Sequence, residues 1–231
     1  MIIKRISHAV ALATCMFLFA GGAQAAAINV FANGGFESNG GIGTTNSATG
    51  WQNAANCYGI SGDAFSGSAS MELATAPFGA AVGLQNSVED GGNPPLDAAG
   101  TTPTLSFWAK GFAGTTGNVL YSLRYLDEIG NILGSTGNVF FQGDINPNTW
   151  TQITNSSVVV PVGTTAAFLE FSQALGPTEA VDSGCVGCLP GSVLIDDVSL
   201  VANVVPVPAA VWLFGSALGL LGFVRRKFAR S

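Results

Sequence analysis

Hydrophobic and polar positions alternate along this chain in short runs, and residues that form turns separate one run from the next. In the run from Val119 to Leu126, the alternate residues Val119, Tyr121, Leu123 and Tyr125 are all apolar or aromatic. A period of two predicts a strand with one buried face, whereas no window of the body has the helical period of 3.6. Strands are predicted at Ser68–Ala74, Thr104–Phe112, Val119–Leu126, Gly137–Gln142, Trp150–Val160, Ala166–Phe171 and Val193–Val201.

Turn signals connect these strands directly, without intervening helices. Asp127–Asn131 has the glycine and asparagine that tolerate positive φ in a hairpin, and Pro161–Thr164 has a similar composition. Short strands at this spacing predict an all-β fold, an antiparallel β-sandwich of the jelly-roll type.

The first 25 residues have the composition of a secretory signal peptide. Lys4 and Arg5 precede the apolar stretch Ala9–Ala20, and Ala23-Gln24-Ala25 provides the small residues of a cleavage site. We expect residues 1–25 to form a signal helix that is removed on export. An uncleaved anchor is the alternative, although the apolar stretch is short for a membrane span.

The other end of the chain, residues 204–231, is an apolar run followed by cations. Residues 204–224 carry no charge, and Arg225, Arg226 and Lys227 follow directly. The run is long enough for a transmembrane helix, and its basic end is expected to stay in the cytoplasm while the body lies outside. A buried C-terminal helix of the body is the alternative. The predicted domains are therefore residues 1–25, 26–203 and 204–231.

This tail resembles the PEP-CTERM sorting signal, in which a short proline motif, an apolar helix and a basic end occur in that order. Pro206 and Pro208 belong to a Val-Pro-Val-Pro motif, which departs from the literal Pro-Glu-Pro and is similar to the Val-Pro-Leu-Pro variant. The resemblance implies a bacterial envelope protein that crosses the inner membrane and is processed by an exosortase-type protease. Proteins with such tails often occur in organisms that make exopolysaccharide.

Charge is segregated between the body and the two ends. Fourteen acids and only two cations, Lys110 and Arg124, give residues 26–203 a net charge of −12. So acidic a domain repels phosphate backbones, which argues against nucleic acid as a partner. The single histidine, His8, lies in the signal, so the body has no serine–histidine triad and no histidine-ligated zinc. A glycosidase-type carboxylate pair, for instance Glu72 and Glu170, needs no histidine.

The body resembles the galactose-binding-like jelly rolls found in many carbohydrate-binding modules. The resemblance covers nearly the whole body and rests on the order of its motifs. These are Asn33–Glu37, Gly50-Trp51, Ser68–Leu73, Leu105–Lys110, Tyr125–Asp127 with Gly130-Asn131, Trp150–Gln152, Pro161–Thr164, Leu169–Phe171 and Val193–Val198.

In such modules the Phe-Glu near the start and an aspartate near the end often hold a structural calcium ion. Carried over to this chain, the resemblance implies Glu37 and Asp197 as ligands, with carbonyl oxygens of Asn33–Gly35 completing a shell of about six to eight oxygens. Alternation along the last strand predicts that Asp196 and Asp197 point to opposite faces, so that only one is a ligand. The alternative is that these carboxylates are simply solvated.

Aromatic residues are the candidates for sugar contacts, because a pyranose ring stacks on an exposed aromatic face. Tyr58, Phe65 and Phe78 lie among glycines and are the candidates for a surface site, whereas Trp51, Trp108 and Trp150 are expected in the core. Phe107 and Trp108 are neighbours on one strand and are therefore expected on opposite faces.

Three cysteines remain once the signal, with Cys15, is removed. Cys185 and Cys188 lie in a glycine-rich loop, where an oxidising compartment favours a disulfide between them. Cys57 bonded to one of the two is the alternative.

Together these observations predict an exported, non-catalytic β-sandwich that adheres to, or assembles with, extracellular exopolysaccharide. A carbohydrate-binding module with a defined glycan ligand is the alternative, and a hydrolase that uses Glu72 and Glu170 is the minor one.

Overall fold

The computed structural model describes residues 28–43, 47–54, 58–75, 80–95, 99–111, 118–174 and 189–202. Ala27–Asn203 form one compact unit. All regular structure within the described residues is β-strand, which confirms the predicted all-β fold. The predicted signal helix, transmembrane helix and sorting motif lie outside the described residues. Among the residues that were described, no helix is long and apolar enough to cross a membrane.

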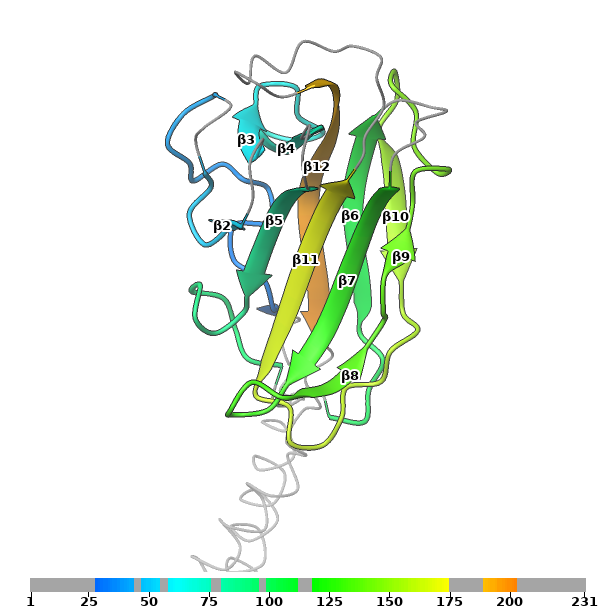
Figure 1. Cartoon of the computed structure of the whole chain (residues 1–231). Coiled ribbons are helices and arrows are strands. Elements are labelled where there is room, and N and C mark those ends of the chain that lie inside the picture. The colour runs from blue at the N-terminus through cyan, green and yellow to red at the C-terminus, as the bar shows by residue number, and fades with distance from the viewer. Residues whose placement is uncertain are drawn as a thin grey trace, which may run out of the picture. The chain divides into compact units, whose positions relative to one another are not determined.

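The strands form two antiparallel sheets (Figure 1). The first sheet has the order β10 (Thr151–Asn155), β6 (Thr104–Gly111), β12 (Leu189–Ala202), β4 (Ser70–Thr75) and β3 (Tyr58–Ser61), with β1 (Ile28–Asn29) paired to β12. The second sheet has the order β2 (Gln52–Asn53), β5 (Ala80–Asn86), β11 (Ala166–Ala174), β7 (Asn118–Leu126) and β8 (Ile132–Ser135), with β9 (Val139–Phe140) paired to β7.

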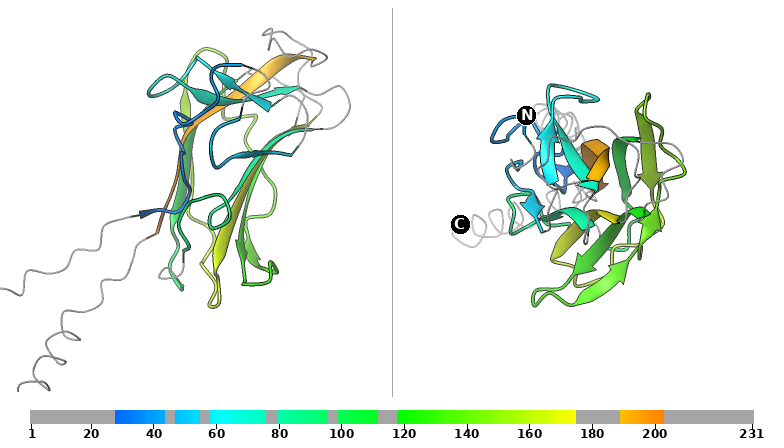
Figure 2. Two further views of the ribbon diagram at one scale, coloured as in Figure 1. Left: turned by 90° about the vertical axis from the view of Figure 1, so that its left-hand side faces the viewer. Right: turned by 45° about the horizontal axis from the view of Figure 1, so that its top comes forward.

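The two sheets lie face to face as the layers of a β-sandwich, seen from the side in Figure 2. The long strands β4, β5, β6 and β7 alternate between the first and the second sheet, and so do β10, β11 and β12. Neighbours along the chain therefore face each other across the core, which is the connectivity expected of the predicted jelly roll.

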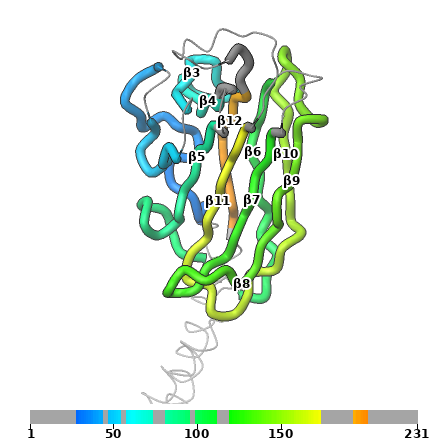
Figure 3. Tube along the Cα trace, in the orientation of Figure 1, coloured from blue at the N-terminus to red at the C-terminus, as the bar shows by residue number. Residues whose placement is uncertain are grey.

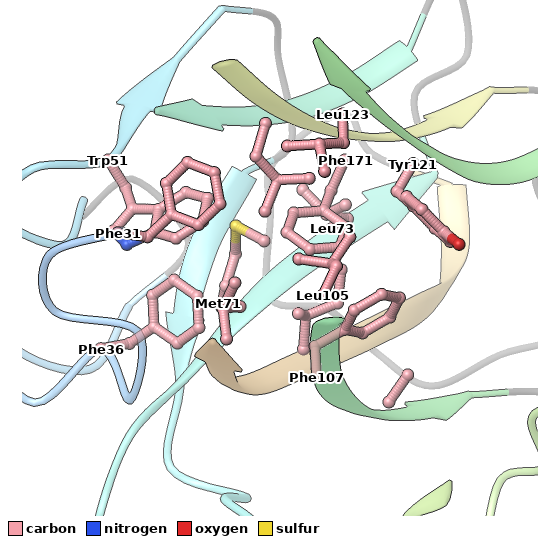
Figure 4. Packing of buried hydrophobic residues seen from close by; sticks show 14 of the residues in the cluster. Phe31, Phe36, Trp51, Met71, Leu73, Leu105, Phe107, Tyr121, Leu123 and Phe171 are labelled. Carbon is pink, nitrogen blue, oxygen red and sulfur yellow. The ribbon is translucent and has the colours of Figure 1, made fainter. Parts of the chain in front are cut away.

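The core lies between the sheets and is rich in aromatic rings (Figure 4). The ring of Phe107 makes T-shaped contacts with Tyr121, Phe141 and Phe171 at centroid distances of 5.3, 5.3 and 4.9 Å. Such contacts contribute about 1 kcal/mol each beyond the apolar area that they bury. The inward alternation predicted for β7 is confirmed, because its four apolar and aromatic residues, Val119, Tyr121, Leu123 and Tyr125, are at most 3% exposed.

Both predicted turns are present. The amide of Asp127 donates to the carbonyl of Asn131 in the β7–β8 hairpin, where Gly130 has a φ of 86°. The amide of Thr164 donates to the carbonyl of Pro161, and Gly163 has a φ of 89°.

Several predicted strand boundaries were wrong. The strand expected at Gly137–Gln142 is only the two residues of β9, and the one expected at Trp150–Val160 ends at Asn155. The sequence patterns also did not predict β3 and β5. Gly83 lies inside β5 because a side chain there would overlap Met71 and Tyr58 of the opposite sheet.

Candidate functional site

The outer face of the second sheet carries a partly exposed ion pair on its central strands, β7 and β11. Leu169 and Phe171 point into the core, so Phe168 and Glu170 point outward. Arg124 of β7 is paired in register with Phe168, and its Nη2 donates to Glu170 Oε2 at 3.0 Å. The guanidinium also lies 5.4 Å from the centre of the Phe168 ring. The two charged side chains are 30% and 24% exposed, so the pair is accessible from solvent.

Apolar side chains flank this ion pair on both sides. Phe140, which is 52% exposed, is paired with Leu120 of β7, and Leu84 of β5 is paired with Glu170. We call the surface formed by Leu84, Asn86, Leu120, Arg124, Phe140, Phe168 and Glu170 the Arg124 face.

The guanidinium of Arg124 retains hydrogen-bonding capacity. It has five N–H donors, and within the described part of the chain its one hydrogen bond is that to Glu170. A guanidinium with further donors beside a carboxylate is chemically suited to bind adjacent hydroxyl groups.

A pocket of about 410 Å³ adjoins the Arg124 face where β7 ends and β11 begins. Its wall includes Asn86 of that face and the side chains of Val88, Glu89, Glu128 and Ile129. Asp127 also lines the pocket, but its carboxylate accepts the amides of Ile129 and Asn131 and the side-chain amide of Asn131. These bonds, above all that from the Asn131 side chain, lower the pKa of Asp127, which identifies it as a turn-stabilising residue.

The outer face of the first sheet carries a cluster of aromatic rings, which we call the aromatic platform: Phe65, Trp108 and Trp150. Phe65 is stacked on Trp108 at a centroid distance of 3.7 Å and an angle of 11°, and it makes a T-shaped contact with Trp150 at 6.2 Å. Lys110 Nζ lies 5.9 Å from the centre of the Trp150 ring and is paired with Asp63.

The loop that carries Phe65, residues 62–69, connects β3 and β4 (Figure 3). Three carboxylates bind this loop. Asp196 Oδ2 accepts the amides of Phe65 and Ser66 at 2.8 and 3.0 Å. Asp197 Oδ1 accepts the hydroxyl of Ser66 at 2.8 Å. Glu37 accepts both the amide and the hydroxyl of Ser68, at 2.8 Å each, and a further amide from Ala69.

Two of the carboxylates that bind the 62–69 loop have pKa values shifted in opposite directions. Glu37 is exposed, and the amide and hydroxyl of Ser68 lower its pKa. Asp196 is fully buried, and desolvation raises its pKa to about 6 despite the three amides that it accepts. The nearby Asp197 carboxylate also raises the pKa of Asp196, by a smaller amount.

The prediction that Asp196 and Asp197 point to opposite faces was wrong, because both bind Ser66. The register of β12 against β6 shifts between Asp196 and Ser199, and Asp197 has a φ of 47°. This bulge breaks the strict alternation and turns two successive carboxylates toward one loop.

The oxygen atoms predicted to bind calcium already accept hydrogen bonds from the protein. Both oxygens of Glu37 accept donors of residues 68 and 69, and Asp197 Oδ1 accepts Ser66. The carbonyls of Asn33 and Gly34 accept the amides of Phe36 and Val198. Among the described residues there is no group of three or more histidine, cysteine, aspartate or glutamate side chains that could hold a metal ion. A calcium ion at these atoms would compete with hydrogen bonds that the protein makes.

The structure separates the predicted aromatic candidates. Tyr58 is not a surface residue, because it is 1% exposed in β3 and packs under Gly83. Phe65, at 40% exposure, is at the surface as predicted. Trp51 is in the core at 3% exposure, whereas Trp108 and Trp150 are half-buried on the outer face rather than in the core. Phe107 and Trp108 do face opposite sides of β6.

Other predicted site residues lie outside the described residues: Phe78, Cys57, Cys185, Cys188 and the sorting-motif residues Pro206, Pro208, Arg225, Arg226 and Lys227.

The carboxylate pair considered for hydrolysis is not brought together. Glu72 lies between the buried Met71 and Leu73 and points outward from the first sheet. Glu170 points outward from the second sheet and is paired with Arg124. Because the two carboxylates lie on opposite outer faces, they cannot act on one glycosidic bond.

The Arg124 face was not predicted as a site, although the sequence contained a signal for it. Alternation in β7 places Arg124 on the polar side of the strand, and Arg124 is one of only two cations in the body. What the sequence did not provide was the register that places Phe168, Glu170 and Phe140 around it.

No protein-family model matches the chain, and a comparison with curated proteins found no match. Solved structures with a similar fold include the enzymatically active domain of tailspike protein 4 from bacteriophage CBA120, at 23% identity and a TM-score of 0.49. The likeness covers 74% of this chain but only 21% of that one.

Two carbohydrate-binding modules are also similar. The CBM22-1 xylan-binding domain of Xyn10C from Paenibacillus barcinonensis has 13% identity and a TM-score of 0.44, with 78% of this chain and 100% of that one covered. TmCBM61, solved with β-1,4-galactotriose, has 16% identity and a TM-score of 0.42, with 74% and 97% covered. Likenesses of this size carry no inference about the ligand or the activity of this chain.

Proposed function

We propose that the β-sandwich binds glycan chains on its Arg124 face without chemically changing them. The observation that supports this most directly is the exposed Arg124–Glu170 pair beside the Phe168 ring, with Phe140 at 52% exposure nearby. Sugars present both an apolar C–H face and adjacent hydroxyls, so a site needs aromatic surface next to charged donors and acceptors.

The geometry of the face suits an extended ligand better than a small one. Phe168 and Arg124 lie at one level of the sheet, and Leu120 and Phe140 lie at another. The pocket of about 410 Å³ continues the surface past Asn86. A chain of several sugar units that follows β7 would therefore meet the pocket, the ion pair and Phe140 in turn.

Two properties of the chain support a non-catalytic role. Residues 26–203 contain no histidine, and the two carboxylates considered for hydrolysis, Glu72 and Glu170, lie on opposite sheets. The groups found on the Arg124 face are sufficient for binding a glycan without hydrolysing it.

The setting that we propose is a bacterial envelope, and it rests on the sequence alone. Residues 1–25 direct export, and the tail with Pro206 and Pro208 is processed by an exosortase-type protease after a transit state in the inner membrane. The released or attached domain then associates with exopolysaccharide. The intact mass of the mature protein tests this: a mass that includes residues 204–231 would contradict tail removal.

Affinity electrophoresis of residues 27–203 in gels that contain soluble polysaccharides tests glycan binding. The panel includes xylan and β-1,4-galactan, because their sugars are named for two of the similar structures. We expect at least one polysaccharide to retard the protein and Arg124→Ala to weaken this binding by about tenfold or more, since a charge-assisted bond contributes roughly 1.5–3 kcal/mol. Arg124→Lys keeps the charge but loses the planar donors, so its binding should be intermediate.

Val162→Ser is the matched control, because Val162 is 87% exposed on the 161–164 turn and makes no part of the Arg124 face. If every polysaccharide retarded Arg124→Ala as much as the unmodified domain, each relative to its own mobility in a gel without polysaccharide, the proposed site would be contradicted.

Calcium is a second candidate ligand, because Glu37 and Asp197 both bind the 62–69 loop, through Ser68 and Ser66 respectively. A cation there would replace hydrogen bonds that the protein already makes. Calorimetric unfolding with calcium and with a chelator tests it, and an unchanged melting temperature would remove the calcium hypothesis.

A further inference from the structure

The aromatic platform leaves a large apolar ring partly in water, although a neighbouring ring covers one of its faces. Phe65 is 40% exposed while it lies parallel to Trp108 at 3.7 Å. The exposed part therefore lies on the side of the ring away from Trp108 and along its free edge. Polar groups lie beside the other two rings of the platform: Lys110, paired with Asp63, lies over Trp150, and Gln152 is exposed opposite Trp108 on β10.

We infer that the aromatic platform is a second glycan-binding surface, on the sheet opposite the Arg124 face, where a pyranose ring stacks on Phe65. Asp63, Lys110 and Gln152 are placed around the platform to bond the hydroxyls of the same sugar. The platform supplies what carbohydrate recognition requires, namely an aromatic face with both charged and amide partners beside it.

The loop is built to hold Phe65 in place before any ligand binds. Amides of Phe65, Ser66 and Ser68 are bonded to the carboxylates of Asp196 and Glu37. Gly67 has a φ of 65°, and a side chain there would overlap the Glu37 carboxylate. A ring fixed in its binding position loses little conformational entropy on binding, which favours affinity.

Charge restricts the chemical class of the occupant. Residues 26–203 have a net charge of −12, and Asp63, which is 49% exposed, lies at the platform itself. An anionic polysaccharide would be repelled at long range, so the expected ligand is a neutral glycan.

A domain with glycan contacts on both outer faces can bridge two polysaccharide chains. The two sheets form the two layers of the sandwich, so their outer faces point in opposite directions (Figure 2). This bridging rests on the proposed function of the Arg124 face, whereas binding at the platform does not.

The indole N–H resonances of ¹⁵N-labelled residues 27–203 provide the test. Residues 27–203 contain three tryptophans, and Trp51 is an internal control because its indole donates to the carbonyls of Ala32 and Asn33. The probes are xylohexaose and β-1,4-galactotriose. We expect at least one of them to shift the indole signals of Trp108 and Trp150 but not that of Trp51.

Phe65→Leu is the decisive variant, because leucine keeps apolar bulk on the loop but cannot offer an aromatic face. We expect it to abolish the shifts while the Trp51 signal and the melting temperature show that the fold is intact. Unshifted Trp108 and Trp150 signals with both probes, or shifts in Phe65→Leu equal to those of the unmodified domain, would overturn the inference.

Arg124→Ala separates this inference from the proposed function. Its indole shifts should persist, because no tryptophan among the described residues lies on the Arg124 face. Light scattering with long soluble xylan or galactan then tests bridging: particles should grow with the unmodified domain and not with either single variant. If particles still grew with Arg124→Ala but not with Phe65→Leu, only the proposal for the Arg124 face would be contradicted. If they still grew with Phe65→Leu but not with Arg124→Ala, only the inference about the platform would be contradicted.

Discussion

The two cations of the body, Lys110 and Arg124, occupy similar positions on opposite outer faces of the sandwich. Each is paired with an acid, Lys110 with Asp63 and Arg124 with Glu170, and each lies within 6 Å of an aromatic ring. The two surfaces differ in what supports them. The Arg124 face consists mainly of side chains on long strands in continuous register, whereas the platform depends on the 62–69 loop.

This difference indicates where binding and stability are coupled. On the Arg124 face, the polar groups are at the surface, and β7 and β11 are held together by their backbone ladder whichever side chains they carry. Beneath the platform, the buried Asp196 is the group that connects the loop to the last strand. Changes to the polar groups of the Arg124 face should therefore affect mainly affinity, whereas a change to Asp196 beneath the platform should affect mainly stability.

The largest expected effect is that of Asp196→Ala. It would leave the amides of Phe65, Ser66 and Asp197 without their acceptor. Because unsatisfied buried amides are costly, we expect a loss of roughly 3 kcal/mol in the free energy of unfolding, or about 10 °C in melting temperature. Denaturant unfolding measures the loss.

Asp197→Asn is the control for this prediction, since asparagine tolerates the left-handed backbone and keeps an acceptor for the Ser66 hydroxyl. It should change stability by less than about 1 kcal/mol. An Asp196→Ala protein as stable as the unmodified one would show that the loop does not depend on this carboxylate.

The second effect is on the pH dependence of stability. Burial raises the folded-state pKa of Asp196 to about 6, above its usual value of 3.8. The native state then binds the proton more tightly than the unfolded state, so the contribution of this group is complete below pH 3.8 and is lost as the pH rises to about 6. A difference of about two pKa units corresponds to roughly 2–3 kcal/mol.

Comparison with Asp196→Asn isolates this contribution, because Glu37 and Asp127, whose pKa values are lowered, act in the opposite direction as the pH falls. As the pH rises from 4 to 6, the free energy of unfolding of the unmodified domain should fall relative to that of Asp196→Asn. Parallel stability curves over this range would contradict a buried carboxyl with a raised pKa.

The sequence predicted those parts of the fold that depend on local pattern. Alternation in β7 identified its buried residues, and glycine and asparagine identified the Asp127–Asn131 turn. Strand β5 was missed because its residue pattern depends on contacts with the other sheet. Gly83 is small so that Met71 and Tyr58 can pack against it. The same contact explains why Tyr58, although it lies near glycines, is buried.

The candidate sites were less predictable because their partners are far apart in the chain. Asp196 binds Phe65 across 131 positions, and Arg124 binds Glu170 across 46. The residue types were visible in the sequence, but the register and the bulge at Asp197 that bring them together depend on tertiary structure.

The smallest expected effect is that of Glu170→Gln on stability. The Arg124–Glu170 pair is partly exposed, and ion pairs of this kind contribute less than about 1 kcal/mol. Glutamine keeps an acceptor for Arg124 Nη2, so the free energy of unfolding should change by less than about 0.5 kcal/mol. Denaturant unfolding and gel retardation on the same samples would show whether stability and affinity separate on this face. If Glu170→Gln destabilised the domain as much as Asp196→Ala, the stability of the domain would depend on the surface ion pair as much as on the buried Asp196, and the contrast between the two faces would be wrong.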